Sequence, residues 1–98
     1  MKPSKSYREE LLKALKDPSE ALLYLDAALE DPDKRVFLLA LRDVAAAQGG
    51  MVALSRRSDL NRENLYRTLS QGGNPSFLGL GAILKALGFR LAVKPLRA

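Results

Sequence analysis

Apolar residues recur every three or four positions along the first half of the chain, a spacing that predicts amphipathic helices. We expect these helices over residues 7–16 and about 18–30, with a third that ends near residue 48. Asp17 and Pro18 mark the second start, because Asp accepts a backbone N–H as an N-cap and Pro suits the first helical position. Asp31-Pro32-Asp33 repeats this start signal before the third helix.

The stretch from Met51 to Ser70 predicts two short helices joined by a tight turn. Leu54 and Leu65 occupy the positions where each helix faces inward, and Asn61 is placed to cap the second helix. This spacing is typical of a helix-turn-helix, whose second helix enters a DNA groove. Gly49-Gly50 separates the pair from the preceding helix, since glycine adopts the left-handed C-cap conformation without steric cost.

The C-terminal third predicts one more helix and a strand. Residues 71–75 have the composition of a loop, Ser76 is an N-cap for a helix rich in Leu and Ile, and Gly88 ends that helix. Residues 89–95 predict a short β-strand, which would need a partner strand in another subunit or another protein. The predicted fold class is all-α, with five or six helices and this C-terminal strand.

Composition limits the chemistry that the chain can perform. At 98 residues it is expected to form a single domain, and it contains no Cys and no His. We therefore expect no enzyme activity, no metal site and no cofactor. Because no apolar run is long enough to cross a bilayer and the start lacks a signal peptide, a cytoplasmic protein without membrane contact is expected. Tyr7 and Tyr24, at helical spacing, are assigned to packing.

Charge divides the chain into two unlike parts. Residues 1–33 carry five Lys or Arg against eight Asp or Glu, whereas residues 34–98 carry eleven against three. The basic part contains the predicted helix-turn-helix, and basic domains suit polyanions because phosphate contacts supply much of the affinity for DNA. The acidic part indicates a second, different partner. Simple solvation of a charged surface remains an alternative for the basic part.

Five residues are candidates to read bases in double-stranded operator DNA. They lie at the start of the second motif helix or one turn further along the same face. Arg can donate two hydrogen bonds to guanine, Glu can accept from cytosine, and Tyr can reach a phosphate or a thymine methyl. The five are Asn61, Arg62, Glu63, Tyr66 and Arg67.

A second set of residues is placed to bind phosphates and so to position the domain on DNA. Arg56 and Arg57 end the first motif helix, Asn64 faces sideways on the second, and Asn74 and Ser76 lie at the N-terminus of the last helix, where free amides bind anions. We expect a homodimer, because one short helix reads few base pairs and a two-fold dimer on a palindrome doubles the contact. Its interface is left open between the last helix and the strand.

The segments AQGGM, LNRENLYRTLS, GNPSF and LKALGFRL, together with DPSEALLYLDAALED, resemble the addiction-module antidote proteins, a family of antitoxins. The resemblance extends from about Tyr7 to Val93. It implies a Cro/C1-type, lambda-repressor-like helix-turn-helix, a cognate RelE/ParE-type toxin as partner, and repression of the protein's own operon. The chain departs from the usual motif at Ser55, where Ala is common, and at Asp59, where Gly is common, but Ser is small and Asp tolerates a left-handed turn.

Together these expectations divide the domain into an acidic, toxin-contacting extension (1–31), a helix-turn-helix core (32–88) and a C-terminal strand (89–95). The leading hypothesis is an antitoxin of a type II toxin-antitoxin module that represses its own operon and neutralises its toxin by direct binding. One alternative is an interaction module that neutralises a basic toxin while DNA binding is weak or lost. Another is a stand-alone or phage-type repressor without a toxin.

Overall fold

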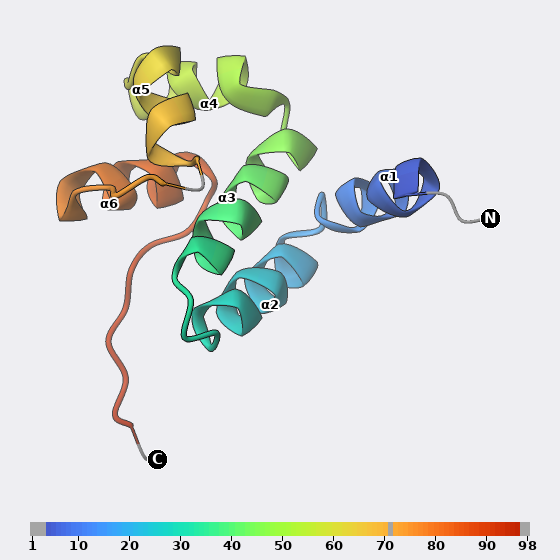
Figure 1. Cartoon of the computed structure of the whole chain (residues 1–98), viewed down its shortest axis with the longest axis horizontal. Helices are drawn as coiled ribbons and strands as arrows, with labels where there is room; N and C mark the ends of the chain where they lie inside the picture. The colour runs from blue at the N-terminus through green and yellow to red at the C-terminus, as the bar shows by residue number, and fades with distance from the viewer. Residues whose placement is uncertain (1–3, 71, 97–98) are drawn as a thin grey trace.

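The computed structural model describes residues 4–70 and 72–96, which form six α-helices and no β-strand (Figure 1). The all-α class and the helix count agree with the prediction. The helices in chain order are α1 (Ser4–Ala14), α2 (Pro18–Leu29), α3 (Arg35–Ala47), α4 (Gly50–Ser58), α5 (Arg62–Thr68) and α6 (Phe77–Ala86).

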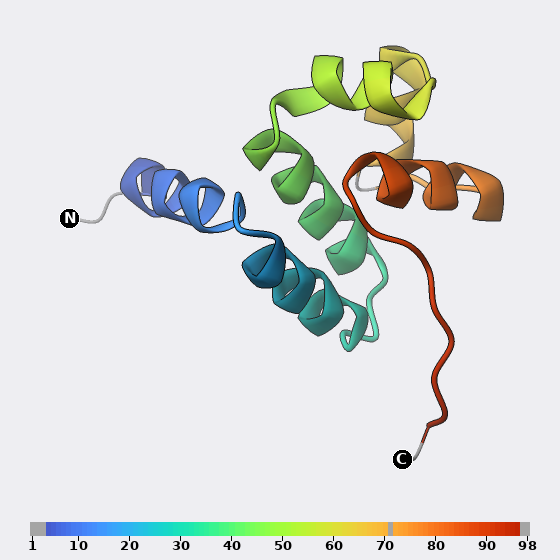
Figure 2. The ribbon, with the colours of Figure 1, turned by 180° about the vertical axis from the view of Figure 1, so that it is seen from behind.

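Helix α3 is the centre of the fold. Figures 1 and 2 show it crossing the middle of the molecule with α2 alongside, and it also packs against α1 and α4. Its residues Leu41 and Val44 are completely buried. Leu54 of α4, Leu65 of α5 and Ile83 of α6 extend this core to the far end of the molecule. One continuous core therefore holds α4, α5 and α6 in fixed positions around the end of α3.

The predicted caps form as the sequence indicates. Asp17 accepts the backbone N–H of Ser19 at 2.9 Å and begins α2, while Ser76 accepts that of Gly79 at 2.9 Å and begins α6. Gly49, with φ +112°, ends α3 in a left-handed conformation. These local signals set the helix boundaries because each satisfies a backbone group that the helix leaves free.

The segment Asp31-Pro32-Asp33 makes an irregular turn instead of starting α3 directly. The carboxylate of Asp31 accepts the N–H of Asp33 at 2.8 Å, and that of Asp33 accepts the N–H of Arg35 at 3.0 Å. These bonds satisfy the donors that an N-cap would otherwise bind, so α3 begins only at Arg35.

The packing prediction is right for Tyr24 and wrong for Tyr7. Tyr24 packs against the core from α2, but Tyr7 is 70% exposed. Helix α1 packs against α3, and Leu15, directly after α1, is buried, whereas the N-terminal end of α1 projects away from the body (Figure 1). Helical periodicity predicted an apolar face but could not reveal how far the partner helix extends.

The predicted strand over residues 89–95 is wrong. Gly88, with φ +95°, turns the chain out of α6, and the N–H of Phe89 donates to the carbonyl of Leu84 at 2.8 Å. Beyond it the chain runs extended past α2, and no strand occurs anywhere in the described residues to pair with it. A strand needs a hydrogen-bonding neighbour as well as a β-like sequence.

The helices in the described part of the chain are 7–13 residues long. No single helix is long and apolar enough to cross a membrane. The pair α3 and α4 passes only when the two are taken together, and they are bent by 98° at their junction.

Candidate nucleic-acid interface

Helices α4 and α5 are joined by a turn whose geometry depends on two polar residues. Asp59 adopts φ 65° and ψ 19°, the left-handed conformation that the sequence analysis expected it to tolerate. Across the turn, the hydroxyl of Ser55 donates to the carbonyl of Leu60 at 2.5 Å. Leu54 and Leu65, each 1% exposed, pack beneath it. The two residues that depart from the usual motif therefore form the turn instead of disturbing it.

The outer face of α5 presents charged and polar groups to solvent. Arg62, Glu63, Tyr66 and Arg67 are all exposed, and Tyr66 retains 52% of its accessible surface. Asn61 caps the helix by accepting the N–H of Asn64 at 2.7 Å, so its amide nitrogen remains available to donate. The structure thus brings the five predicted base-reading residues together on or beside one exposed helix face.

Arg67 is held by its neighbour on α5. Its guanidinium donates to the side-chain oxygen of Asn64, one turn earlier on the helix. Because the backbone N–H of Asn64 also donates to the side chain of Asn61, these three residues form one local network. Asn64 therefore orients an arginine, a role compatible with its predicted sideways position.

A cleft of about 300 Å³ lies between α5 and the start of α6 and brings together predicted phosphate ligands. Gly73 makes this arrangement possible: a Cβ there would lie 1.9 Å from the carbonyl oxygen of Thr68. The loop can pass against the end of α5 only because this residue has no side chain. Predicted site residues that line the cleft are Asn64, Arg67, Asn74 and Ser76.

Arg56 and Arg57 do not line the clefts beside α5. Arg57 instead points back to the end of α3 and donates to the side-chain oxygen of Gln48 at 3.2 Å and to its backbone carbonyl at 3.3 Å. Gln48 in turn donates to the carbonyl of Leu87 at 3.1 Å. Arg57 therefore ties the end of α4 to the C-cap of α3, and Gln48 ties that cap to the end of α6. Sequence analysis missed Gln48, although its place before Gly49-Gly50 marked it as a helix C-cap.

The N-terminal helices are attached to α3 through one carboxylate. Asp43 accepts a hydrogen bond from Tyr24 of α2 at 2.7 Å and pairs with Arg8 of α1 at 3.0 Å. Burial, followed by the hydrogen bond to Asp43, raises the pKa of Tyr24 well above its ordinary value of 10.0. Tyr24 is therefore a neutral donor. Through these two bonds, Asp43 joins α1 and α2 to α3.

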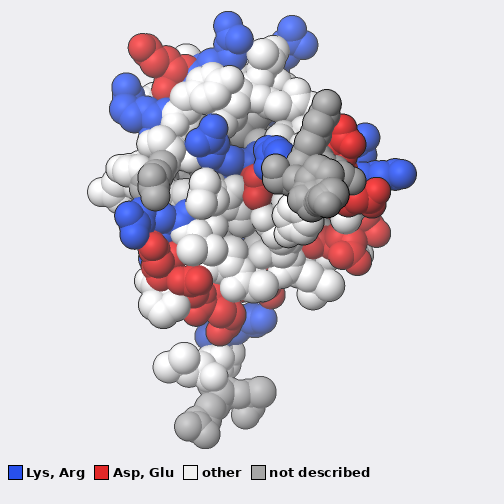
Figure 3. Space-filling model, turned by 45° about the vertical axis from the view of Figure 1, so that its right-hand side comes forward, with Lys and Arg blue, Asp and Glu red and all other residues white. Residues whose placement is uncertain are grey.

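Charged side chains are unevenly distributed over the surface. In Figure 3, Lys and Arg prevail in the upper part of the face shown, while Asp and Glu gather lower down and at the right-hand edge. This separation follows the sequence, in which the last two-thirds of the chain carry most of the basic residues. No cluster of three or more Asp or Glu that could hold a metal occurs in the part of the chain that the structure describes.

Comparison with known proteins identifies relatives by sequence. The pattern of a family described as "Probable addiction module antidote protein" matches residues 6–95. An uncharacterized protein from Haemophilus influenzae is 35% identical over 83 residues, which make up 85% of this chain and 84% of the relative. No solved structure matches the chain.

Proposed function

Because the chain belongs to the family of probable addiction-module antidote proteins, we propose that it is a DNA-binding antitoxin that represses its own operon. The family supplies the antitoxin role, and the exposed face of α5 supports the DNA-binding role. Arg62 and Glu63 occupy the first turn of a helix that follows a tight turn, as in helix-turn-helix proteins. The α4–α5 pair is accordingly proposed to be of the Cro/C1, lambda-repressor-like type.

Base reading is assigned to the exposed face of α5 and to its N-cap. Arg62 and Arg67 suit guanine, Glu63 suits cytosine, and Asn61 retains donors for an acceptor on a base. The α5–α6 cleft, with Asn74 and Ser76 on its rim, would receive a backbone phosphate on one side of the groove. Arg56, which is exposed, remains a candidate for a further phosphate.

A gel-shift titration tests this function directly. The full chain is titrated against the DNA upstream of its own operon and against a scrambled duplex of equal length and composition, at rising salt. We expect the upstream DNA to bind at least 10³-fold more tightly than the scrambled duplex. Equal affinity for both would reject the repressor hypothesis and favour an interaction module that lacks specific DNA binding.

A substitution in α5 identifies the residue that reads bases. Arg62→Gln should weaken binding to the upstream DNA by about 1–3 kcal/mol and leave the scrambled duplex almost unaffected. Arg90→Gln removes the same charge from the extended C-terminal segment and serves as the control. An equal loss with both variants would mean that Arg62 contributes only charge.

Toxin binding is assigned to the N-terminal helices. Residues 1–33 are acidic, and α2 exposes Leu22, Leu23 and Leu29 beside its packed face. The acidic residues would attract a basic toxin of the RelE/ParE type, and the exposed leucines would supply apolar area to bury. Co-expression with the product of the adjacent reading frame tests the assignment. Leu22→Asp should abolish growth rescue, and Lys85→Asp on α6 should not.

A homodimer is proposed for the DNA-bound state. Helix α5 has seven residues and reads few base pairs, so two copies on a palindrome would double the contact. Phe77 and Leu78 at the start of α6 are 76% and 81% exposed and form one candidate interface, and Val93 in the C-terminal segment belongs to the other. Light scattering of the Leu78→Ser and Val93→Ser variants distinguishes the two candidate interfaces. Only the variant whose substitution lies in the true interface should be monomeric.

A further inference from the structure

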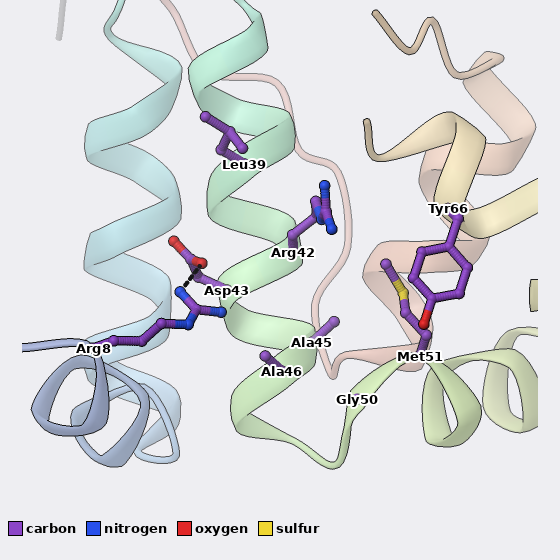
Figure 4. A pocket seen from close by; sticks show the side chains of 9 residues that line it. All are labelled: Arg8, Leu39, Arg42, Asp43, Ala45, Ala46, Gly50, Met51 and Tyr66. Carbon is purple, nitrogen blue, oxygen red and sulfur yellow. Dashed lines mark hydrogen bonds and ion pairs between the residues drawn. The ribbon is translucent and has the colours of Figure 1, made fainter. Parts of the chain in front are cut away.

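A second cleft, of about 420 Å³, lies on the opposite side of α5 from the α5–α6 cleft. Figure 4 shows it between α1, the C-terminal half of α3 and the side of α5 that carries Tyr66. Its walls come from helices far apart in the sequence, so no sequence motif marks it. The lining residues are Arg8, Leu39, Arg42, Asp43, Ala45, Ala46, Gly50, Met51 and Tyr66.

The charge of this cleft is set by one carboxylate and two guanidinium groups. Asp43 is already occupied, since it accepts hydrogen bonds from Arg8 and Tyr24. Arg42 makes no ion pair with any carboxylate in the described residues. The cleft therefore keeps a net positive charge, and the free cation is the guanidinium of Arg42.

Arg42 is positioned to act together with α5. Its side chain is half-buried and extends from α3 on the side where Tyr66 of α5 lies (Figure 4). Tyr66 lies one turn after Arg62 on α5, and its hydroxyl can donate to an anion. An arginine and a tyrosine facing one opening beside a groove-binding helix form a typical site for a phosphate oxygen, because guanidinium donates two hydrogen bonds to it.

We propose that Arg42 and Tyr66 bind a phosphate of the DNA backbone at this cleft, on the side of the groove opposite the α5–α6 cleft. The proposal rests on the proposed DNA-binding function and deepens it. With one phosphate site on each side, α5 would be held between the two DNA strands that border the groove. These contacts would fix the depth and angle of α5 in the groove. Arg8 contributes by neutralising Asp43, which would otherwise repel the phosphate.

Salt-dependent DNA binding tests the site. Arg42→Gln should weaken binding roughly tenfold, by a similar factor for the upstream DNA and the scrambled duplex, and reduce the slope of log affinity against log salt by about one. Tyr66→Phe should act in the same direction with an unchanged salt slope. Arg42→Lys keeps the charge and should restore the slope while recovering only part of the affinity.

Arg90→Gln is the matched control, because it removes one positive charge from an exposed residue outside the cleft. If Arg42→Gln and Arg90→Gln reduce the DNA affinity and the salt slope by the same amounts, the cleft does not bind phosphate and the proposal is overturned. Loss of toxin binding by Arg42→Gln with DNA binding intact would also overturn it and assign the cleft to the toxin. Thermal unfolding of each variant excludes a folding defect, and Arg42→Lys provides the folded comparison.

The wild-type titration distinguishes failure of the repressor function from failure of the phosphate site. If the wild-type chain does not prefer its upstream DNA, the proposed repressor function fails whatever the variants show. If it does prefer that DNA but Arg42→Gln behaves like the control, only the phosphate site fails.

Discussion

The two ends of the molecule differ in what they expose. The helices α4 and α5 bury Leu54 and Leu65 beneath the turn at Asp59 and present arginines and amides on the outer face of α5. The region of α1, α2 and the extended C-terminal segment leaves apolar side chains in solvent: Leu23 is 64% exposed and Val93 is 100% exposed. Both regions pack on α3, so one core supports two unlike surfaces.

This difference indicates two kinds of partner. Exposed arginines around a helix gain free energy from phosphates, and that gain weakens as salt rises. Exposed leucines gain free energy only when another apolar surface covers them, which salt hardly weakens. Under the proposed function, a nucleic acid would bind the surface around α5 and a protein would bind the exposed leucines of α2.

Replacing one leucine in each region should give the largest contrast. Leu54→Ala, in the buried turn, is expected to lower the free energy of unfolding by about 2–5 kcal/mol. Leu22→Ala, where half of the side chain is exposed, should lower it by less than about 1 kcal/mol and instead weaken toxin binding. Urea titrations measure both values. Similar losses of stability would contradict the division between a packing surface and a binding surface.

Gly73→Ala should distort the DNA-binding region specifically. The added Cβ would collide with the carbonyl of Thr68 at 1.9 Å, so the loop before α6 must move. We expect a loss of about 1–3 kcal/mol in unfolding free energy and a weaker interaction with DNA. Gly72→Ala, where the Cβ meets nothing within 4 Å, is the control and should be nearly silent. Equal effects would show that the α5–α6 cleft does not depend on this contact.

Tyr24→Phe should loosen the joint between the N-terminal helices and α3. It removes the hydrogen bond to Asp43 while keeping the ring, and the expected loss is about 1–2 kcal/mol. Tyr7→Phe, at a 70% exposed position, is the matched control. Hydrogen exchange of α1 and α2 should report the change, while exchange in α5 should remain as in the wild type. Faster exchange in α5 would mean that the two regions are coupled.

The smallest expected effect is a pH dependence at the connection between α2 and α3. The side chain and then the backbone N–H of Arg35 bind Asp33 and lower the pKa of its carboxyl from 3.8 to about 2. The folded state thus favours the ionised form, so this contribution to stability is present above about pH 4 and disappears as the pH falls toward 2. Asp33→Asn should flatten the unfolding curve against pH in that window. An unchanged curve would show that the ion pair contributes nothing.

Sequence reasoning succeeded wherever a backbone group is satisfied within a few residues. Asn61 and Ser76 form their predicted caps, and Asp59 adopts its predicted left-handed conformation. It failed at Tyr7 and at residues 89–95, where the outcome depends on a neighbouring element that local spacing does not reveal. The candidate base-reading residues belong to the first group, since they share one short helix.

What the sequence determined by itself is therefore the set of helices, the turn between α4 and α5, and the exposed face of α5, because these depend on hydrogen bonds and side-chain spacing within one or two turns. Only the tertiary structure decided that Arg57 binds Gln48, and that Arg42 and Tyr66 share a cleft. Both arrangements join residues from different helices, whose relative positions are set by the packing of the whole core around α3.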